Sequence, residues 1–112
     1  MGGYVIRIAY YFMLIFEAFL IISFADRRTE RFFHAGMCDL RWQTFAKIAR
    51  RKLDYLDAAK SILDLLHPPG NRLECLQGNR AGQWCIRIND QWRLCFIWTG
   101  KGASHVEIVD YH

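Results

Sequence analysis

Residues 83–98, with the sequence QWCIRINDQWRLCFIW, decide the fold of the C-terminal half of this chain. On each side of the central NDQ, large apolar residues alternate with polar or small ones, as they do in half-buried strands. Asn89, Asp90 and Gln91 are residue types that tight turns tolerate. The stretch therefore predicts a β-hairpin with one buried face.

A three-residue loop determines which residues face each other across this hairpin. The large apolar groups then share one side of the sheet, as a buried face requires, in the pairs Ile88–Trp92, Ile86–Leu94 and Trp84–Phe96. On the other side Arg87 lies opposite Arg93, and Cys85 lies opposite Cys95. Because like charges that face each other are mildly destabilising, the arginine pair indicates either a bound anion or neutralisation by nearby carboxylates and water.

Length and composition indicate one folded domain. The chain has 112 residues, enough for a single core, and 53% of them are hydrophobic, which argues against disorder. Its 15 Lys and Arg residues exceed its 11 Asp and Glu residues. This basic balance permits a polyanionic partner without requiring one.

The four cysteines, Cys38, Cys75, Cys85 and Cys95, carry little metal-binding signal. None forms a C-x-x-C pair or has a His at ligand spacing, which argues against a zinc site. A disulfide between Cys85 and Cys95 fits the register above. We expect instead free thiols that act as small apolar groups in a reducing cytoplasm.

Residues 4–24 form the most hydrophobic run of the chain. Arg7 and Glu17 interrupt it and leave nine uninterrupted apolar or aromatic residues, too few to span a bilayer. No small-residue cleavage site follows. Three interpretations stay open: a membrane-associating segment, an additional helix, or translated sequence upstream of the true start.

The rest of the pattern predicts helices before Pro68 and strands after it. Asp26 is a suitable N-cap for a helix over residues 27–35, and apolar residues at three- and four-residue spacings predict a second helix over residues 43–60. In the second helix Ile48 belongs to the apolar stripe and Asp57 faces water. One more helical turn, residues 61–66, precedes the stop at His67-Pro68-Pro69-Gly70-Asn71.

Short strands are expected at residues 21–24, 73–76 and 105–109, beside the hairpin. The predicted fold class is α+β, with two N-terminal helices packed on one face of a small, mainly antiparallel sheet of about four to five strands. The helices cover the apolar face of the hairpin. The face that carries Arg87 and Arg93 stays open and polar.

The residues available for chemistry suit metal-free phosphodiester cleavage. The sequence contains no convincing Ser-His-Asp order, phosphate-binding glycine loop or metal cluster. Arginines bind phosphate and stabilise the charge that develops on it, and a terminal His112 is suited to acid–base work near neutral pH. On chemistry alone, the simpler interpretation of His112 is an exposed side chain without a role.

Several motifs resemble the HigB branch of the RelE/ParE toxin superfamily. The most specific are IRINDQWRLCF at residues 86–96 and the terminal VDYH at residues 109–112. Two weaker motifs support them, namely PPGNRL at residues 68–73 and the glycine-containing segment 76–82. The likeness covers about residues 20–112. It implies the RelE-like fold.

The resemblance also implies a function. Members of this kind are toxins of type II toxin–antitoxin pairs, and the resemblance implies a ribosome-dependent mRNA endonuclease that inhibits translation. It would cut A-site codons by activating the ribose 2′-hydroxyl against the adjacent phosphate, with no metal or other cofactor. The implied partners are a HigA-like helix-turn-helix antitoxin, the ribosome and mRNA in the cytoplasm, and DNA only through the antitoxin. No stable membrane partner is expected.

Roles for individual residues follow from the same resemblance. Arg93 and the terminal cluster Asp110, Tyr111 and His112 match the catalytic positions, with His112 as the acid or base. Arg87 and Arg93 match the basic sheet positions that would hold the scissile phosphate. Arg72, Arg80 and Gln77 are the further candidate RNA-binding residues. The sequence departs from some relatives at Glu74 and Gln77, which stand where those relatives have His and Lys. Arg72 or Arg80 would then replace the missing phosphate contact.

Relatives typically begin Met-Ile-x-Ser-Phe, and residues 20–24, LIISF, fit that beginning with Leu20 at the initiator position. We therefore expect the toxin domain to comprise residues 20–112. Residues 1–19 would be a hydrophobic extension that comes from an upstream start assignment.

Two alternatives of other classes stay open. A ParE-like toxin would inhibit gyrase and cleave nothing, and it would have no need of an acid or base in the terminal D-Y-H. A non-catalytic nucleic-acid-binding module would bind through its basic surface. Its affinity would fall steeply with salt and survive His112→Ala.

Overall fold

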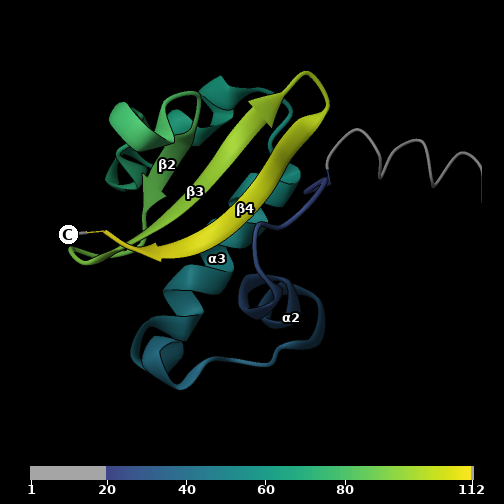
Figure 1. Ribbon diagram of the computed structural model, residues 1–112, viewed down its shortest axis with the longest axis vertical. Coiled ribbons are helices and arrows are strands. Elements are labelled where there is room, and N and C mark those ends of the chain that lie inside the picture. Colours follow the sequence, from purple (N-terminus) through teal and green to yellow (C-terminus); the bar gives the residue numbers. More distant parts are fainter. Residues whose placement is uncertain (1–19, 112) are drawn as a thin grey trace, which may run out of the picture.

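The structure, a computed structural model, describes residues 20–111 of the chain. Residues 1–19 and His112, and with them the expectations that concern these positions, lie outside this range. Two α-helices, α2 (Arg27–Ala35) and α3 (Ala46–Ala58), precede a single antiparallel sheet (Figure 1). Neither is long and apolar enough to cross a membrane. The strands follow one another in the sheet in chain order, β1 (Glu74–Cys75), β2 (Trp84–Arg87), β3 (Trp92–Thr99) and β4 (Gly102–Asp110).

The hairpin register is the one that the alternation predicts. Strands β2 and β3 align in the pairs Trp84–Phe96, Cys85–Cys95, Ile86–Leu94 and Arg87–Arg93. The Ile88 N–H donates to the Trp92 carbonyl at 3.0 Å, which closes the loop of residues 89–91. One face of the hairpin is therefore apolar throughout.

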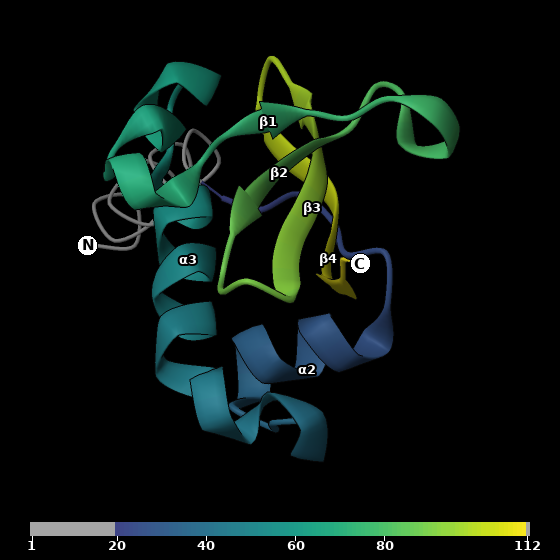
Figure 2. The ribbon, with the colours of Figure 1, turned by 90° about the vertical axis from the view of Figure 1, so that its left-hand side faces the viewer.

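The two helices pack against that apolar face, as expected. Leu53 and Leu56 of α3 and Phe32 of α2 share one core with Ile86 and Phe96 of the sheet, and all five side chains are at most 5% exposed. Figure 2 shows α3 running alongside the sheet and α2 crossing at its lower end. This layer leaves the second face of the hairpin without a helix.

The helices are not N-terminal elements of the described chain, in contrast to our expectation. Both follow an extended segment, residues 20–24, which forms one parallel bridge with β4, between Phe24 and Val106, and does not form a full strand. Further hydrogen bonds join the segment to β4, such as that from the Ile22 N–H to the Ala103 carbonyl at 2.7 Å. The sheet consequently has four strands. The segment approaches β4 closely, because a Cβ atom on Gly102 would lie only 2.8 Å from the Leu20 carbonyl oxygen. Glycine makes this contact possible.

The second helix begins later than the apolar spacing predicted. A 3₁₀ turn, Leu40–Phe45, precedes α3 and buries Trp42 and Phe45, and three residues per turn place such a pair on the same side. Within α3, Ile48 is 39% exposed instead of buried. Asp57 does not face water, since its carboxylate accepts the Ile21 N–H at 2.8 Å and burial raises its pKa.

The connections around the sheet also differ from the predicted bounds. Residues 62–66 form a separate 3₁₀ turn, Ile62–Leu66, because Ser61 and Asp64 form a capping box at its start. Strand β4 starts three residues before the predicted position 105, where Gly102 already pairs with Thr99. Backbone pairing with β3 extends this strand through small residues that carry little strand signal of their own.

Candidate functional site

The second face of the hairpin is apolar in its middle, which corrects the expectation of an open polar face. Cys85 and Cys95 are 0% exposed and form a small cluster with Leu76, against which Val109 and Tyr111 pack. Leu76 lies there because its N–H donates to the Gln83 carbonyl at 2.8 Å, next to the β1–β2 pairing. The polar groups are consequently concentrated at the loop end of this face.

The two facing cysteines are free thiols. A hydrogen bond with Cys85, together with burial, raises the pKa of the Cys95 thiol above its ordinary value. A neutral, buried thiol behaves as a small apolar group. Cys85 and Cys95 therefore form a buried apolar base for this face, next to the polar residues at the loop end.

Arg87 and Arg93 lie opposite each other at that loop end. The Arg87 side chain is 28% exposed and its Nη2 lies 2.5 Å from the carboxylate of Asp90. Arg93 donates to the Asn89 carbonyl in the loop, and its guanidinium carbon lies 5.5 Å from the centre of the Tyr111 ring. Both guanidinium groups are thus held by the hairpin that carries them.

Positive charge converges on the one carboxylate in this loop. The hydrogen bond and charge of Arg87 lower the pKa of Asp90, and the charges of Arg72 and Arg93 lower it further. Arg72 reaches this position from the turn before β1, where its backbone is left-handed with φ 46°. The Nε atom of Arg87 is buried and has no hydrogen-bond partner among the described residues.

The C-terminal residues are joined to the same loop. The Tyr111 N–H donates to the Gln91 carbonyl at 2.7 Å, and the Gln91 side-chain amide donates to Asp110 at 3.1 Å. Tyr111 therefore lies beside Arg93, whereas Asp110 is held by the loop residue Gln91. The structure thus brings four of the predicted site residues together, namely Arg72, Arg87, Arg93 and Tyr111. Asp110 pairs with Trp92 and lines a hollow with Arg41 and Phe45, on the other face of the sheet.

Of the other two predicted RNA-binding residues, Arg80 lies near Tyr111 but is already paired, and Gln77 stands apart. Arg80 donates to Glu107 at 2.9 Å and to Gln83 at 3.0 Å, and the hydrogen bond to Glu107 is the main reason that its pKa is raised. Gln77 is exposed at the start of the turn Gly78–Arg80, which projects away from the sheet (Figure 2). Of the two, only Arg80 lies over the sheet face.

Lys52 is a cation near the site that sequence reasoning missed. Its side chain is buried, with 8% exposure, and its Nζ donates to the Asn71 side chain at 2.5 Å. Burial, then the charges of Arg51 and Arg87, lower its pKa. The available signal was the spacing, since position 52 continues the buried series 49, 53 and 56.

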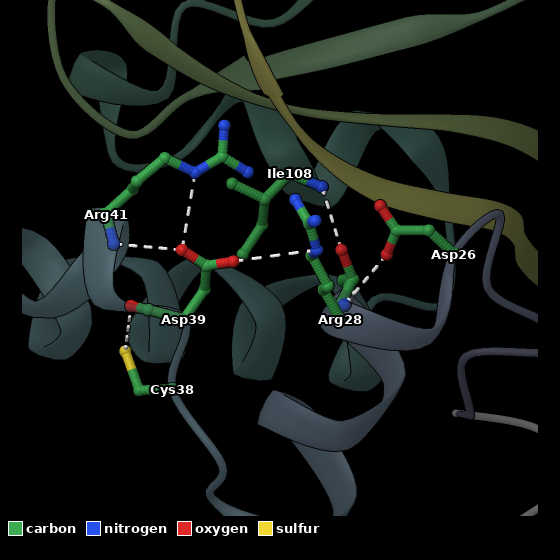
Figure 3. Close-up of polar contacts among 7 residues, drawn as sticks. Asp26, Arg28, Cys38, Asp39, Arg41 and Ile108 are labelled. Atoms are coloured by element: carbon green, nitrogen blue, oxygen red, sulfur yellow. Dashed lines mark hydrogen bonds and ion pairs between the residues drawn. The ribbon is translucent and has the colours of Figure 1, made fainter.

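A second arginine–carboxylate cluster lies on the helical side of the molecule (Figure 3). The Asp39 carboxylate accepts the backbone N–H of Arg41 at 2.9 Å and its Nε at 3.3 Å, and the Nε of Arg28 lies 3.6 Å away. The hydrogen bond from the Arg41 backbone is the largest cause of the lowered pKa of Asp39. This cluster joins α2 to the 3₁₀ turn that begins at Leu40.

Among residues 20–111, no three His, Cys, Asp or Glu side chains gather in a way that could hold a metal ion. The groups that do gather are guanidinium donors, a phenol and a carboxylate. Arginines arranged in this way bind phosphate through several hydrogen bonds and stabilise additional negative charge on it. A phosphate-binding site is therefore the chemistry that this surface supports.

Comparison with known proteins finds similar sequences. The family model described as RelE-like toxin of type II toxin-antitoxin system HigB matches residues 22–112. A stretch of 63 residues is 59% identical to Toxin HigB-1 of Vibrio cholerae serotype O1, over 55% of this chain and 64% of that protein. A stretch of 60 residues is 42% identical to an uncharacterised protein of Haemophilus influenzae, over 54% of this chain and 59% of that protein. Neither match reaches two thirds of the relative's own length.

Proposed function

This chain belongs to the HigB-like family of RelE-like toxins from type II toxin–antitoxin systems, and from that premise we propose that it is an endoribonuclease that cleaves mRNA on the ribosome. Translation then stops because the codon in the ribosomal A site is cut. We assign this activity to residues 20–112. The proposal places the protein in the cytoplasm, with ribosomes and mRNA.

One observation carries the proposal: Arg87 and Arg93 face each other at the loop end of the hairpin, beside Tyr111. Two guanidinium groups in this position repel each other unless an anion lies between them. A phosphodiester supplies that anion and presents two oxygens to them. RNA adds a 2′-hydroxyl next to each phosphate, which is the nucleophile that metal-free cleavage requires.

The proposed reaction is an attack of this hydroxyl on the neighbouring phosphorus. A general base removes the 2′-hydroxyl proton, the 2′-oxygen bonds to phosphorus, and the bond from phosphorus to the 5′-oxygen breaks. A general acid returns a proton to the 5′-oxygen, so the products are a 2′,3′-cyclic phosphate and a 5′-hydroxyl. His112 is the proposed acid or base. Arg93, with Arg87 and Arg72, stabilises the charge that develops on the phosphate.

Family membership also defines the proposed partners. A type II toxin is held inactive by an antitoxin protein, here a HigA-like protein with a helix-turn-helix domain. Operator DNA would then be bound only through that antitoxin. The ribosome supplies the mRNA in an extended form. The basic surface of the chain, with 15 cations against 11 anions, suits both RNA partners.

Mapping mRNA 5′ ends in translating bacteria tests the proposal. Induction of the wild-type chain is expected to arrest growth and to create new ends inside codons. His112→Ala is expected to reduce these ends about 100-fold, within the range of general acid–base catalysis. His34→Ala, which removes an exposed imidazole on α2, is the matched control and leaves cleavage unchanged. Growth arrest with unaltered mRNA ends would overturn the nuclease and favour a ParE-like inhibitor of gyrase.

A further inference from the structure

Asp90 lies at the point where the positive charge of the site converges. Its carboxylate lies 2.5 Å from Arg87 Nη2, and Arg72 and Arg93 also lower its pKa. Its side chain is nevertheless 98% exposed. A carboxylate in this position is held by its charge-assisted hydrogen bond with Arg87 and not by packing.

The surrounding cations exceed what one carboxylate can neutralise. Arg87 keeps a buried Nε–H for which no acceptor exists among the described residues. Behind Arg87, the buried amine of Lys52 has the neutral Asn71 side chain as its acceptor. A buried donor without an acceptor costs free energy, and uncompensated positive charge attracts an anion. The site therefore calls for an anion with more oxygens than Asp90 provides.

The loop allows Asp90 to leave without disturbing the hairpin. The Asn89 side chain accepts the backbone N–H groups of Gln91 at 2.9 Å and Trp92 at 2.8 Å. These bonds hold the loop backbone in place independently of the Asp90 side chain. Rotation of one exposed side chain is enough to release Arg87.

We propose that Asp90 is a stand-in for the RNA phosphate, which holds Arg87 in its binding position and is displaced when a phosphodiester binds. This inference rests on the proposed function, since it takes the phosphate to be that of RNA. It makes Asp90 a specificity-determining residue. A phosphodiester can compete with the internal carboxylate because its two non-bridging oxygens can accept from both Arg87 and Arg93, whereas among the described residues Asp90 accepts from Arg87 alone.

Titration of the purified full-length chain with inorganic phosphate tests this. The side-chain N–H resonance of Arg87 in nitrogen-15 NMR spectra reports binding directly. Asp90→Asn, which removes the charge and keeps the shape, is expected to lower the Kd for phosphate about two- to fivefold, the range for loss of an exposed competing ion pair. Asp54→Asn, which removes an exposed carboxylate paired with Arg50 on α3, controls for the change in net charge and shifts the Kd by less.

A double variant identifies the residue through which Asp90 acts. In an Arg87→Ala background, where the Arg93 side-chain N–H resonance reports binding instead, the Asp90→Asn change is expected to leave the Kd unaltered. An equal Kd for wild type and Asp90→Asn, an effect equal to that of Asp54→Asn, or no phosphate binding by either chain would overturn the inference. Because phosphate binding requires no cleavage, the result is independent of the mRNA mapping. Cleavage with an unchanged Kd refutes the role of Asp90 alone, and a lowered Kd without cleavage refutes the nuclease alone.

Discussion

The molecule contains two clusters in which arginines surround one aspartate, and they differ in what else holds the carboxylate. Asp39 joins Arg28 of α2 to Arg41, and its side chain is 18% exposed and accepts a backbone N–H (Figure 3). Asp90 pairs with Arg87 in the hairpin loop, and its side chain is 98% exposed. A carboxylate held by the backbone and by two elements is fixed. A carboxylate held by one side chain is exchangeable.

The comparison teaches that residue types alone do not separate a structural cluster from a binding site. Around Asp39, Arg28 joins α2 to the following turn, and Arg41 bonds to Asp39 and lies over the Trp92 ring of β3. Around Asp90 a buried donor of Arg87 stays without a partner among the described residues. Trp42 Nε1, in the turn that carries Arg41, is also buried without a partner in residues 20–111. The buried donor of Arg87 differs in that it belongs to a cationic side chain and lies among other arginines.

The largest expected effect is a loss of mRNA cleavage on substitution of an arginine in the Asp90 cluster but not in the Asp39 cluster. Arg93→Ala is expected to lower mRNA cleavage about 100-fold or more, because it removes a donor aimed at the charge of the transition state. Arg28→Ala, in the Asp39 cluster, is expected to leave cleavage unchanged. Quantitative mapping of mRNA ends after matched induction measures both variants. Equal losses would erase the functional distinction between the clusters.

Arg93 also donates to the Asn89 carbonyl in the hairpin loop, so stability has to be measured alongside. Thermal unfolding followed by circular dichroism shows whether Arg93→Ala is folded at the growth temperature. Arg93→Lys keeps the charge and loses the two-pronged donor geometry. A folded Arg93→Lys variant that cleaves at the wild-type rate would contradict the phosphate-binding role.

The next largest effect is a loss of stability on substitution of Asn71, whose buried side chain bonds to Lys52 near the Asp90 cluster. Asn71 is 0% exposed and bonds to Lys52 Nζ and to the carbonyls of Leu65 and His67. Asn71→Ala is expected to lower the free energy of unfolding by about 3 kcal/mol, because it leaves a buried cation and two carbonyls without partners. Urea unfolding measures this. Asn79→Ala, at an exposed position, serves as the control and is expected to stay within about 0.5 kcal/mol of wild type.

The smallest effect tests whether Asp39 is structural, through the pH dependence of stability. Hydrogen bonds from Arg41, led by its backbone N–H, and the charges of Arg41 and Arg28 hold the pKa of Asp39 below its ordinary value of 3.8. Its contribution to stability is therefore present above that ordinary value and is lost as pH falls through the lower folded pKa. The melting temperature of Asp39→Asn should lie below that of wild type at neutral pH and approach it in acid. A constant difference would show that the ionised carboxylate is not the cause.

The hairpin was predictable because the features that determine it, alternation and a short loop, lie within neighbouring residues of the sequence. Alternation with a period of two assigns each side chain to a face, and a short loop determines the register, so Arg87 and Arg93 could be placed opposite each other. The start of α3 was not predictable in this way. Burial of Trp42 and Phe45 at a spacing of three turned residues 40–45 into a 3₁₀ turn, and that burial depends on the sheet.

The chemistry of the site was partly predictable from residue types and from the terminal motif. The sequence identified the arginines and Tyr111, and it could not show that Arg80 pairs with Glu107 or that Lys52 is buried. Each of those facts depends on contacts between residues 19 to 27 positions apart in the chain. Pairwise spacing along a helix or strand carries no information about such contacts.

The sequence by itself determined the hairpin, its register and the family, because alternation and linear motifs are properties of neighbouring residues. Only the tertiary structure decided which carboxylate is fixed and which is exchangeable. Asp39 and Asp90 are chemically the same group, each beside arginines. The packing of α2 against the turn of residues 40–45 holds the first, and the open end of the hairpin exposes the second to solvent and to an incoming phosphate.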